Sequence, residues 1–576
     1  MKRWYKYIKP YLSAFILGPL CMIIEVIGEV VMPKLLSVII NNAEAGTLTN
    51  AGSISIMIAM IITAILMMAG GVGGAYFGAK AAVNFAADLR QDVYKKIQKF
   101  SFANIDKFST GSLVTRLTND VTQLQNFVNM LLRMALRAPG MMVAALIMAI
   151  LTKPSLSVVF AVSMPVMIVI ILFIISKGFP LFSRRQTKID AVNSAVQEDI
   201  TNIKVVKSFV REDFEENKFR FANAELKESG LKAMRVMIFL MPVTTLFMNL
   251  TVLAVILFGG NIVLSGEMPI GDLSAFLTYV TQILSSLMMV TMMLMTSSRA
   301  LASAKRITEV LDEKITLDDE NAKYPDKKVE KGEIEFKNVS FRYYKNSQGL
   351  VLDDVSLKIP AGALVGIIGS TGAGKTTLVS LISRLYDVDE GTVLVDGQDV
   401  RDYSLKNLRD GVGVVLQKNT LFSGTIEENL RWGNEDASME EIIAAAKSAQ
   451  ADKFISTFPD GYQTKLDQGG VNVSGGQKQR LCIARALLKK PKILVLDDST
   501  SAVDTATEAQ IRYAFAHELS DSTKIIIAQR ISSVMDADMI IVLNDGKITG
   551  IGNHKELLEN NTEYREIYYS QVGEEK

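Results

Sequence analysis

Asn472-Val473-Ser474-Gly475-Gly476-Gln477 begins a predicted helix between a phosphate-binding loop and an acidic strand end. The two glycines behind the serine leave backbone N–H groups at the helix start that an anion can approach closely. The helix dipole adds a favourable field at the same end. These residues therefore indicate a binding site for a phosphate or a similar anion.

A second phosphate motif lies upstream, where Gly369-Ser370-Thr371-Gly372-Ala373-Gly374-Lys375-Thr376 fits G-x-x-x-x-G-K-[ST]. The buried strand Val365-Gly366-Ile367-Ile368 precedes this loop and a predicted helix over 376–385 follows it, which is the context that the motif requires. Downstream, the apolar run Leu494-Val495-Leu496 ends in Asp497-Asp498. This order of elements predicts an α/β domain that binds a nucleotide.

The chemistry of the loop follows from charge. Lys375 is expected to meet the β- and γ-phosphates, and the backbone N–H groups of residues 372–377 are expected to surround them. The Thr376 hydroxyl is a candidate ligand of Mg²⁺. The sequence thus predicts ATP and Mg²⁺ as cofactors.

Together these segments resemble the nucleotide-binding domain of ATP-binding cassette (ABC) transporters, and the resemblance extends over nearly the whole chain. It implies that Asp497 holds Mg²⁺ through water, that Gln417 belongs to a loop contacting Mg²⁺ and water, and that Asp504 lies in the D-loop at a dimer interface. Tyr343 matches a position whose ring stacks on adenine, although a half-buried strand tyrosine is the plainer interpretation. The expected ATP-binding residues are Tyr343, Gly369, Ser370, Thr371, Gly372, Ala373, Gly374, Lys375, Thr376 and Thr377, and the expected signature residues are Ser474, Gly475, Gly476 and Gln477.

Two positions depart from the family pattern, in which a glutamate follows the magnesium aspartate and a histidine ends the switch strand. This chain has Asp498 and Gln529 there. A general base must reach water within about 2.6 to 3.2 Å, and aspartate is one methylene shorter than glutamate. Glutamine can donate a hydrogen bond but does not titrate near neutral pH. We therefore predict that the phosphate loop of this chain forms a degenerate ATP site.

An intact Ser474–Gln477 motif beside a degenerate site favours a heterodimer. In the family each ATP site is shared, because the signature motif of one subunit closes the phosphate loop of the other. The chain resembles the degenerate-site subunit of bacterial heterodimeric multidrug exporters, which are half-transporters of the type IV, B-family-like class. The predicted partner is a second, non-identical half-transporter with glutamate and histidine in its ATP site; a slow homodimer is the alternative.

Composition divides the 576 residues into two parts, although the hydrophobic share is 49% overall. Long apolar tracts dominate up to about residue 300, whereas charged residues, glycines and short apolar runs alternate from about residue 313. We predict an all-α transmembrane domain with six spans over 1–312, a linker over 313–332 and the α/β P-loop cassette over 333–576. A net charge of +1 gives no reason to expect nucleic acid as a partner.

Six tracts are long and apolar enough to cross a lipid bilayer. Basic residues flank these tracts unevenly, since residues 41–52 and 265–272 contain no lysine or arginine, whereas residues 2–9 and 84–130 contain many. The positive-inside rule then places both termini and the ATP domain in the cytoplasm of a multi-pass protein of the cell membrane. The predicted spans are 12–40, 53–83, 131–152, 155–177, 234–264 and 273–298.

The long charged loops 84–130 and 178–233 resemble exporter intracellular loops, most clearly at 108–120 and 203–209. Such loops carry short coupling helices that dock on the cassettes. We expect one near 104–112 and another near 210–220.

Glu25 and Glu29 lie one helical turn apart in an apolar tract and so share one side of the first span. Carboxylates are costly in a membrane, about 2.5 to 3.5 kcal/mol each on insertion scales. They pair with Lys34, Arg133 or Arg137, lie close to the membrane interface, or form a cation-attracting patch in the substrate path. The run Met288, Met289, Met292, Met293 and Met295 is expected to be core or lipid-facing packing rather than the lining of an adaptable cavity.

The function predicted from these features is ATP-driven export of small hydrophobic or amphipathic compounds out of the cytoplasm. A lipid or a peptide is an alternative cargo. Outside transport, an ATP-gated regulatory complex is the alternative, which vectorial movement of a dye would separate from an exporter.

Overall fold

The computed structural model describes residues 2–319, 322–343, 349–498 and 505–572. The chain forms two compact units. The first comprises Met1–Gln98 and Thr110–Asp312, and the second comprises Lys99–Ser109 and Glu313–Lys576. A short segment of the N-terminal half therefore belongs to the C-terminal unit.

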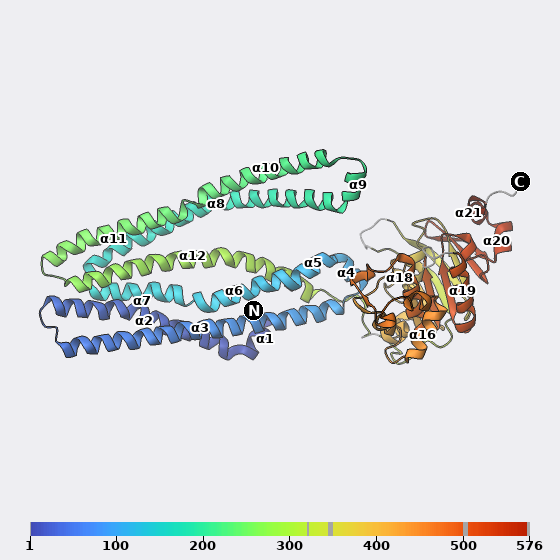
Figure 1. Ribbon diagram of the computed structural model, residues 1–576, viewed down its shortest axis with the longest axis horizontal. Coiled ribbons are helices and arrows are strands. Elements are labelled where there is room, and N and C mark those ends of the chain that lie inside the picture. The colour runs from blue at the N-terminus through green and yellow to red at the C-terminus, as the bar shows by residue number, and fades with distance from the viewer. Residues whose placement is uncertain (1, 320–321, 344–348, 499–504, 573–576) are drawn as a thin grey trace. The chain divides into compact units, whose positions relative to one another are not determined.

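The first unit is all helical (Figure 1). A π-helical turn at Arg116–Asp120 joins two of its helices. In the described part of the chain, six segments are long and apolar enough to cross a membrane: Arg3–Glu44, Asn50–Gln98, Thr110–Thr152, Pro154–Thr201, Glu212–Leu264 and Ile270–Met293. The helices are α1 (Lys2–Ile8), α2 (Leu12–Glu44), α3 (Asn50–Gln98), α5 (Thr110–Thr115), α6 (Val121–Met134), α7 (Arg137–Thr152), α8 (Pro154–Thr201), α9 (Ile203–Ser208), α10 (Glu212–Met237), α11 (Leu240–Leu264) and α12 (Ile270–Asp312).

The prediction of six membrane helices is confirmed, and several of them continue well beyond one bilayer thickness. Helix α12 packs against α2, α6 and α7, while α8 runs beside α10 and α11 (Figure 1). The largest apolar core of this unit draws on α2, α7, α8, α11 and α12. These contacts hold α2 and α12 close together, and Gln282 of α12 donates to the carbonyl oxygen of Glu29 in α2.

Helices α2 and α3 pack closely because glycines face the contact. Gly70, Gly74 and Gly78 recur every four residues along α3 and are all buried. A Cβ atom on Gly70 would lie only 2.8 Å from the carbonyl oxygen of Cys21 and 3.0 Å from the nitrogen of Glu25. Small residues at this spacing let two membrane helices bring their backbones together.

Replacing Gly70 by alanine is therefore expected to lower the free energy of unfolding by about 1 to 3 kcal/mol, because an added methyl group forces the two backbones apart. Gly140 provides a matched control, since it lies in a membrane helix and a Cβ there would meet nothing within 4 Å. Thermal unfolding of the detergent-purified protein compares the two variants. Equal melting temperatures for Gly70→Ala and Gly140→Ala would contradict the packing argument.

The short helices of the two intracellular loops differ in position from the prediction. Helix α4 (Phe102–Phe108) ends where Ser109 takes a φ of 53°, so the expected helix at 104–112 is two helices, α4 and α5. In the second loop the short helix is α9 (Ile203–Ser208), and residues 212–220 form the start of the long α10. Both bounds were expected from the resemblance and were wrong, because a resemblance does not reveal single residues with left-handed backbone, here Ser109 and Val210.

The second unit is an α/β domain with a mixed six-stranded sheet, a four-stranded antiparallel sheet and a two-stranded one. Its strands are β1 (Ile334–Phe341), β2 (Leu352–Ile359), β3 (Leu364–Ile368), β4 (Glu390–Val395), β5 (Gln398–Asp399), β6 (Val412–Val415), β7 (Gly424–Thr425), β8 (Lys465–Leu466), β9 (Ile493–Asp497), β10 (Thr523–Ile527), β11 (Met539–Asn544) and β12 (Lys547–Gly552). Its helices besides α4 are α13 (Lys375–Ile382), α14 (Leu405–Gly411), α15 (Ile426–Arg431), α16 (Met439–Ser448), α17 (Asp452–Ile455), α18 (Gly475–Leu488), α19 (Thr505–Glu518), α20 (His554–Asn560) and α21 (Thr562–Val572).

The large sheet is buried on both faces. In β9, Ile493 and Val495 belong to one apolar cluster, whereas Leu494 and Leu496 belong to another. Successive strand residues point to opposite faces, so a continuous apolar run fits a strand covered on both sides. The order β12-β11-β3-β10-β9-β6 places β10 between the strand before the phosphate loop and the strand that ends in Asp497.

Candidate functional site

The candidate site lies at the carboxyl ends of four neighbouring parallel strands. Gly369 follows β3, Gln529 lies just after β10, Asp498 follows β9, and Gln417 lies just after β6. Ligands of open α/β sheets bind at this edge because loops and helix starts converge there. The sheet order thus brings together four segments that are up to 160 residues apart in the sequence.

Glycines shape the phosphate loop. Gly369 has a φ of 154°, and a Cβ atom there would lie 1.9 Å from the carbonyl oxygen of Leu543. Gly374 has a φ of 97° and directly precedes α13. A side chain at either position would be strained or would clash, so the loop can take this shape only with glycine. By contrast, a Cβ at Gly372 would meet nothing within 4 Å, so the loop is open on that side.

Lys375 and Asp497 are the charged groups of the loop region. The Lys375 ammonium donates to the carbonyl oxygens of Gly369 and Ser370, at 2.8 and 2.7 Å. Burial lowers the pKa of Lys375, although the nearby Asp497 and Asp498 act against this effect. Burial likewise raises the pKa of Asp497, while a hydrogen bond from Thr376 opposes that rise. Each charge is therefore held in partly apolar surroundings that a ligand of opposite charge would compensate.

The residues present fit a nucleotide with Mg²⁺. The Thr376 hydroxyl lies 2.9 Å from Oδ2 and 3.1 Å from Oδ1 of the buried Asp497. A hydroxyl and a carboxylate therefore already lie side by side, where one metal ion could contact both. Oxygen donors of this kind, with Gln417 nearby, suit Mg²⁺. When bound, the ion would neutralise phosphate charge. Lys375 and the open face of the loop at Gly372 would hold the phosphates themselves.

Asp498 is held by two side-chain amides. Gln529 donates from Nε2 to Oδ2 of Asp498 at 2.8 Å, and Gln417 donates to the same oxygen at 3.3 Å. The backbone N–H of Asp498 donates to the carbonyl oxygen of Ile527 at 2.9 Å, and the residue has a φ of 46°. Both amides thus bind the same carboxylate oxygen and hold the Asp498 side chain in this position.

Sequence reasoning missed Gln571, which fixes the loop that carries Gln529. Gln571, in α21, donates to the carbonyl oxygen of Gln529 at 2.8 Å and accepts from the N–H of Ile531 at 2.8 Å. The two bonds tie the residues after β10 to the C-terminal helix. Nothing in the local sequence around residue 571 signals this role.

Tyr343 follows β1 and packs among side chains next to α13. Its hydroxyl is 2.8 Å from that of Thr377, and its ring meets Phe341 and Tyr386 edge-on. Because 37% of the residue is exposed, part of its surface is free for an adenine ring. Tyr343 lies two residues beyond the end of β1, so the strand-tyrosine interpretation is wrong, while the adenine interpretation stays a prediction.

Tyr386 also connects the cassette to helix α4. Its hydroxyl donates to Oδ2 of Asp106 at 3.0 Å, and its ring contacts Phe102 with centroids 6.0 Å apart. Asn104 donates to the carbonyl oxygen of Lys314 at 2.9 Å. Helix α4 is thus held in the ATP-binding unit by contacts at Phe102, Asn104 and Asp106.

Replacing Tyr386 by phenylalanine is expected to loosen α4 without displacing its ring contacts. Loss of one hydrogen bond costs about 1 kcal/mol, which corresponds to roughly fivefold faster hydrogen exchange of the amides in Phe102–Phe108. Mass-spectrometric hydrogen exchange on the purified protein measures the rate. Exchange in α16 serves as the internal control, and an equal change in both helices would point to general destabilisation instead.

The Ser474–Gln477 motif caps helix α18. The Ser474 hydroxyl accepts from the N–H of Gln477 at 3.3 Å, and the Gln477 side chain accepts from the N–H of Ser474 at 2.9 Å. This reciprocal arrangement is a capping box, and it leaves the amides of Gly475 and Gly476 at the helix start. The side chains of Ser474 and Gln477 are therefore each bound to the backbone N–H of the other residue.

In the membrane unit, both predicted carboxylates contact one arginine. Nη2 of Arg137 lies 2.6 Å from Glu29 and 3.2 Å from Glu25. Lys34, another candidate partner, pairs with Asp272 at 2.8 Å. Asp504 of the predicted D-loop lies outside the described residues, as does the side chain of Met295.

Comparison with known proteins identifies the two units. The family model for the ABC transporter transmembrane region matches residues 15–287, and that for the ABC transporter ATP-binding region matches residues 352–501. An uncharacterized ABC transporter ATP-binding protein of Bacillus subtilis, YfiB, is 39% identical over 579 residues, which cover 100% of this chain and 99% of that protein. The chain belongs to the ABC transporter family. As in other ABC transporters, the ATP-binding domain implies ATPase-coupled transport.

Two further proteins narrow the type of ABC transporter. YgaD of Bacillus subtilis, whose name assigns it to multidrug export, is 34% identical over 574 residues that cover 99% of this chain and 98% of that protein. The structure of a bacterial Atm1-family ABC exporter with ATP bound matches with a TM-score of 0.81 and 27% identity, covering 99% of both chains. The chain therefore has the fold of an ABC exporter of this family, with a helical membrane domain ahead of its cassette.

Proposed function

We propose that this ABC transporter is one subunit of a heterodimeric exporter, in which its own ATP site hydrolyses poorly and its signature motif completes the working site of the partner. The observation that carries the proposal is the pair of amide contacts on Oδ2 of Asp498. A general base must come within about 2.6 to 3.2 Å of the attacking water, and the two amides hold the short aspartate side chain back from such a reach. Glutamine at 529 also offers no titratable group near neutral pH.

The residues that bind nucleotide are retained, which supports binding without fast turnover. Lys375, Thr376 and Asp497 keep the contacts described above, and the glycines keep the loop open. Such a site would hold ATP between the subunits through several turnovers of the other site. The required partner is a non-identical half-transporter with glutamate and histidine at the equivalent positions.

The proposed cycle alternates between two states. ATP at both shared sites closes the cassettes, and helix α4 passes the closure to the membrane helices, so that a central cavity opens outward. ATP must prefer the closed state for this to occur, since a ligand of equal affinity shifts nothing. The attachment of α4 to Tyr386 and Lys314 supports its role in transmission.

The proposed cargo is a hydrophobic or amphipathic compound exported from the cytoplasm across the cell membrane, with both termini and the cassette on the cytoplasmic side. The multidrug name of the relative YgaD supports this cargo, and the absence of lysine and arginine from the outer loops 41–52 and 265–272 supports this orientation. A lipid or peptide cargo remains the alternative within transport. Dye movement into inside-out proteoliposomes distinguishes all of these from a regulatory complex, which would bind ATP without moving solute.

The decisive experiment isolates the chain from its native membrane and sequences any second polypeptide. The purified chain alone is expected to bind ATP yet release phosphate slowly, and activity is expected to return when the partner is added. Brisk ATPase activity and dye transport by a homodimer would refute the proposal. So would a partner that lacks glutamate and histidine at the corresponding positions.

A further inference from the structure

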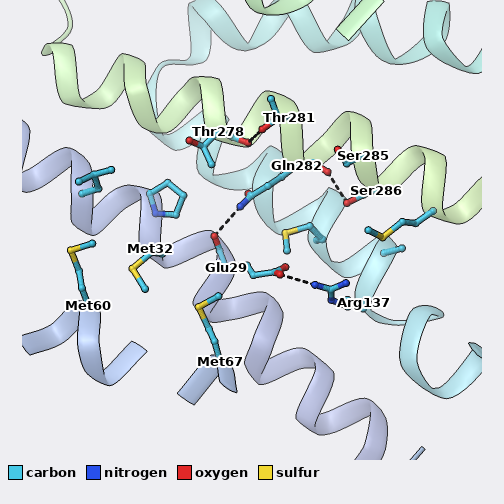
Figure 2. Close-up of a pocket in the computed structure, with 15 residues that line it drawn as sticks. Glu29, Met32, Met60, Met67, Arg137, Thr278, Thr281, Gln282, Ser285 and Ser286 are labelled. Carbon is cyan, nitrogen blue, oxygen red and sulfur yellow. Dashed lines mark hydrogen bonds and ion pairs between the residues drawn. The ribbon is translucent and has the colours of Figure 1, made fainter. Parts of the chain in front are cut away.

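The membrane unit contains a cavity of about 530 Å³ between α2, α3, α7 and α12 (Figure 2). Glu29 and Arg137 point toward each other at its edge, and Gln282 reaches across from α12. Thr278 and Thr281 line the α12 side with further polar groups. A volume of this size is enough for a drug-sized molecule.

The charges around this cavity do not balance. Glu25 and Glu29 share the single guanidinium of Arg137, so two carboxylates face one cation. The nearby Lys34 contributes nothing, because it is engaged by Asp272. With these groups ionised, one negative charge is left over in partly buried surroundings, where it would attract a cation strongly.

Two polar atoms beside the carboxylates lack partners among the described residues. Gln282 donates from Nε2 to the carbonyl oxygen of Glu29 at 2.9 Å, but its buried Oε1 accepts nothing. The buried Nε of Arg137 also donates to nothing. A buried acceptor without a donor is unfavourable, and an N–H group on a bound molecule would satisfy the Gln282 oxygen.

The remaining wall is apolar and adaptable. Met32, Met60 and Met67 lie around the cavity on the side of α2 and α3 (Figure 2). Met141 and Met289 line it from α7 and α12. Thioether side chains are flexible and make favourable contacts with aromatic rings. Met289 is thus cavity lining, which differs from the packing role expected for its run of methionines.

From this combination we infer that the cavity binds a monovalent amphipathic organic cation, with an N–H group toward Glu29 and Gln282 and a ring system among the methionines. Arg137 is the internal counter-ion that holds the carboxylates in place while the cavity is empty. The inference names the substrate class of the proposed exporter and rests on that proposal for its role in transport, although binding itself does not require export.

The test measures binding of ethidium, a fluorescent aromatic cation with amino groups, without nucleotide. It uses the full-length protein, with any subunit that copurifies, in phosphatidylcholine nanodiscs. Variants change the net charge of Glu25, Glu29 and Arg137 stepwise. Glu29→Gln removes the excess negative charge, Arg137→Gln increases it, and the double variant restores the wild-type net charge. Glu225→Gln is the matched control, because it also removes one carboxylate, it breaks the Lys188–Glu225 ion pair between α8 and α10, and neither residue lines the cavity.

Ethidium affinity is expected to follow the charge. It should fall about tenfold or more in Glu29→Gln, recover to within about threefold in the double variant, and stay unchanged in Glu225→Gln, since unit charges a few ångströms apart interact strongly. Equal affinity of wild type and Glu29→Gln would overturn the inference. Failure of a folded double variant to recover would overturn it too, as would tight binding of the anion oleate that displaces ethidium from the wild type.

If variants at Arg137 do not fold, Glu25→Gln combined with Glu29→Gln supplies the second measurement. Of the three charged groups Glu25, Glu29 and Arg137, that variant keeps Arg137 alone, so it is expected to lose ethidium and to gain oleate binding. Retention of ethidium would contradict the inference. Because no step involves ATP, the result does not depend on whether the chain works as a heterodimer, and a finding that the complex is a homodimer would leave it intact.

Discussion

Replacing Gly475 by glutamate is expected to lower the ATPase activity of the assembled transporter by about 100-fold or more while leaving the chain folded. A Cβ at Gly475 would meet nothing within 4 Å, so the side chain has room. A carboxylate at a helix start is favourable for the helix itself. The loss of ATPase activity therefore arises only where the helix start faces the phosphates of a nucleotide. Preorganised dipoles at a reacting phosphate raise the reaction rate by about 100- to 1,000-fold.

The same proposal gives the opposite expectation for the phosphate loop of this chain. Lys375→Met should weaken ATP binding at the degenerate site, yet reduce steady-state ATPase activity of the complex by only about fivefold, which is far less than the about 100-fold loss at a working site. Phosphate release by the copurified complex, measured beside thermal unfolding of each variant, compares the two. A larger loss from Lys375→Met than from Gly475→Glu would mean that this chain, and not its partner, holds the main site.

The position of the site could be predicted from the sequence because its motifs carry their own backbone requirements. The glycines at 369 and 374 and the acidic end of β9 are local features, and the structure places them at one sheet edge. The substitutions at 498 and 529 are also visible in the sequence. Their direct contact is not, because it depends on β9 and β10 being neighbours in the sheet.

Features that arise from tertiary contacts were beyond sequence reasoning. Gln571 holds the loop after β10 from a helix that is about 40 residues away, and Tyr386 holds α4 from almost 300 residues away. The sequence also left the partner of Glu25 and Glu29 open among three cations. Only the packing of α2 against α7 selects Arg137 and leaves Lys34 to α12.

Restoring the missing catalytic groups is expected to turn the degenerate site into a working one. The double variant combines Asp498→Glu with Gln529→His. Its longer carboxylate can extend past the amide of Gln417 toward water, and the hydrogen bond that Gln529 donates to the carboxylate in the wild type is removed. A positioned general base contributes about 100- to 10,000-fold. We therefore expect phosphate release by the purified chain alone to rise at least about tenfold, allowing for the strain of glutamate at a φ of 46°.

The control for this gain is Asp498→Gln with Gln529→His, which supplies the ring and the longer side chain without a base. It should bind ATP as tightly as the restored variant and remain inactive. The pH dependence of ATPase activity adds a second criterion. A histidine at 529 that titrates near its ordinary pKa of about 6.5 should make the activity of the restored variant change across that pH, whereas the wild type should show no such change. If the restored variant stays inactive while it binds ATP and remains folded, the block lies elsewhere than in Asp498 and Gln529, and the assignment of a degenerate site to these two residues is wrong.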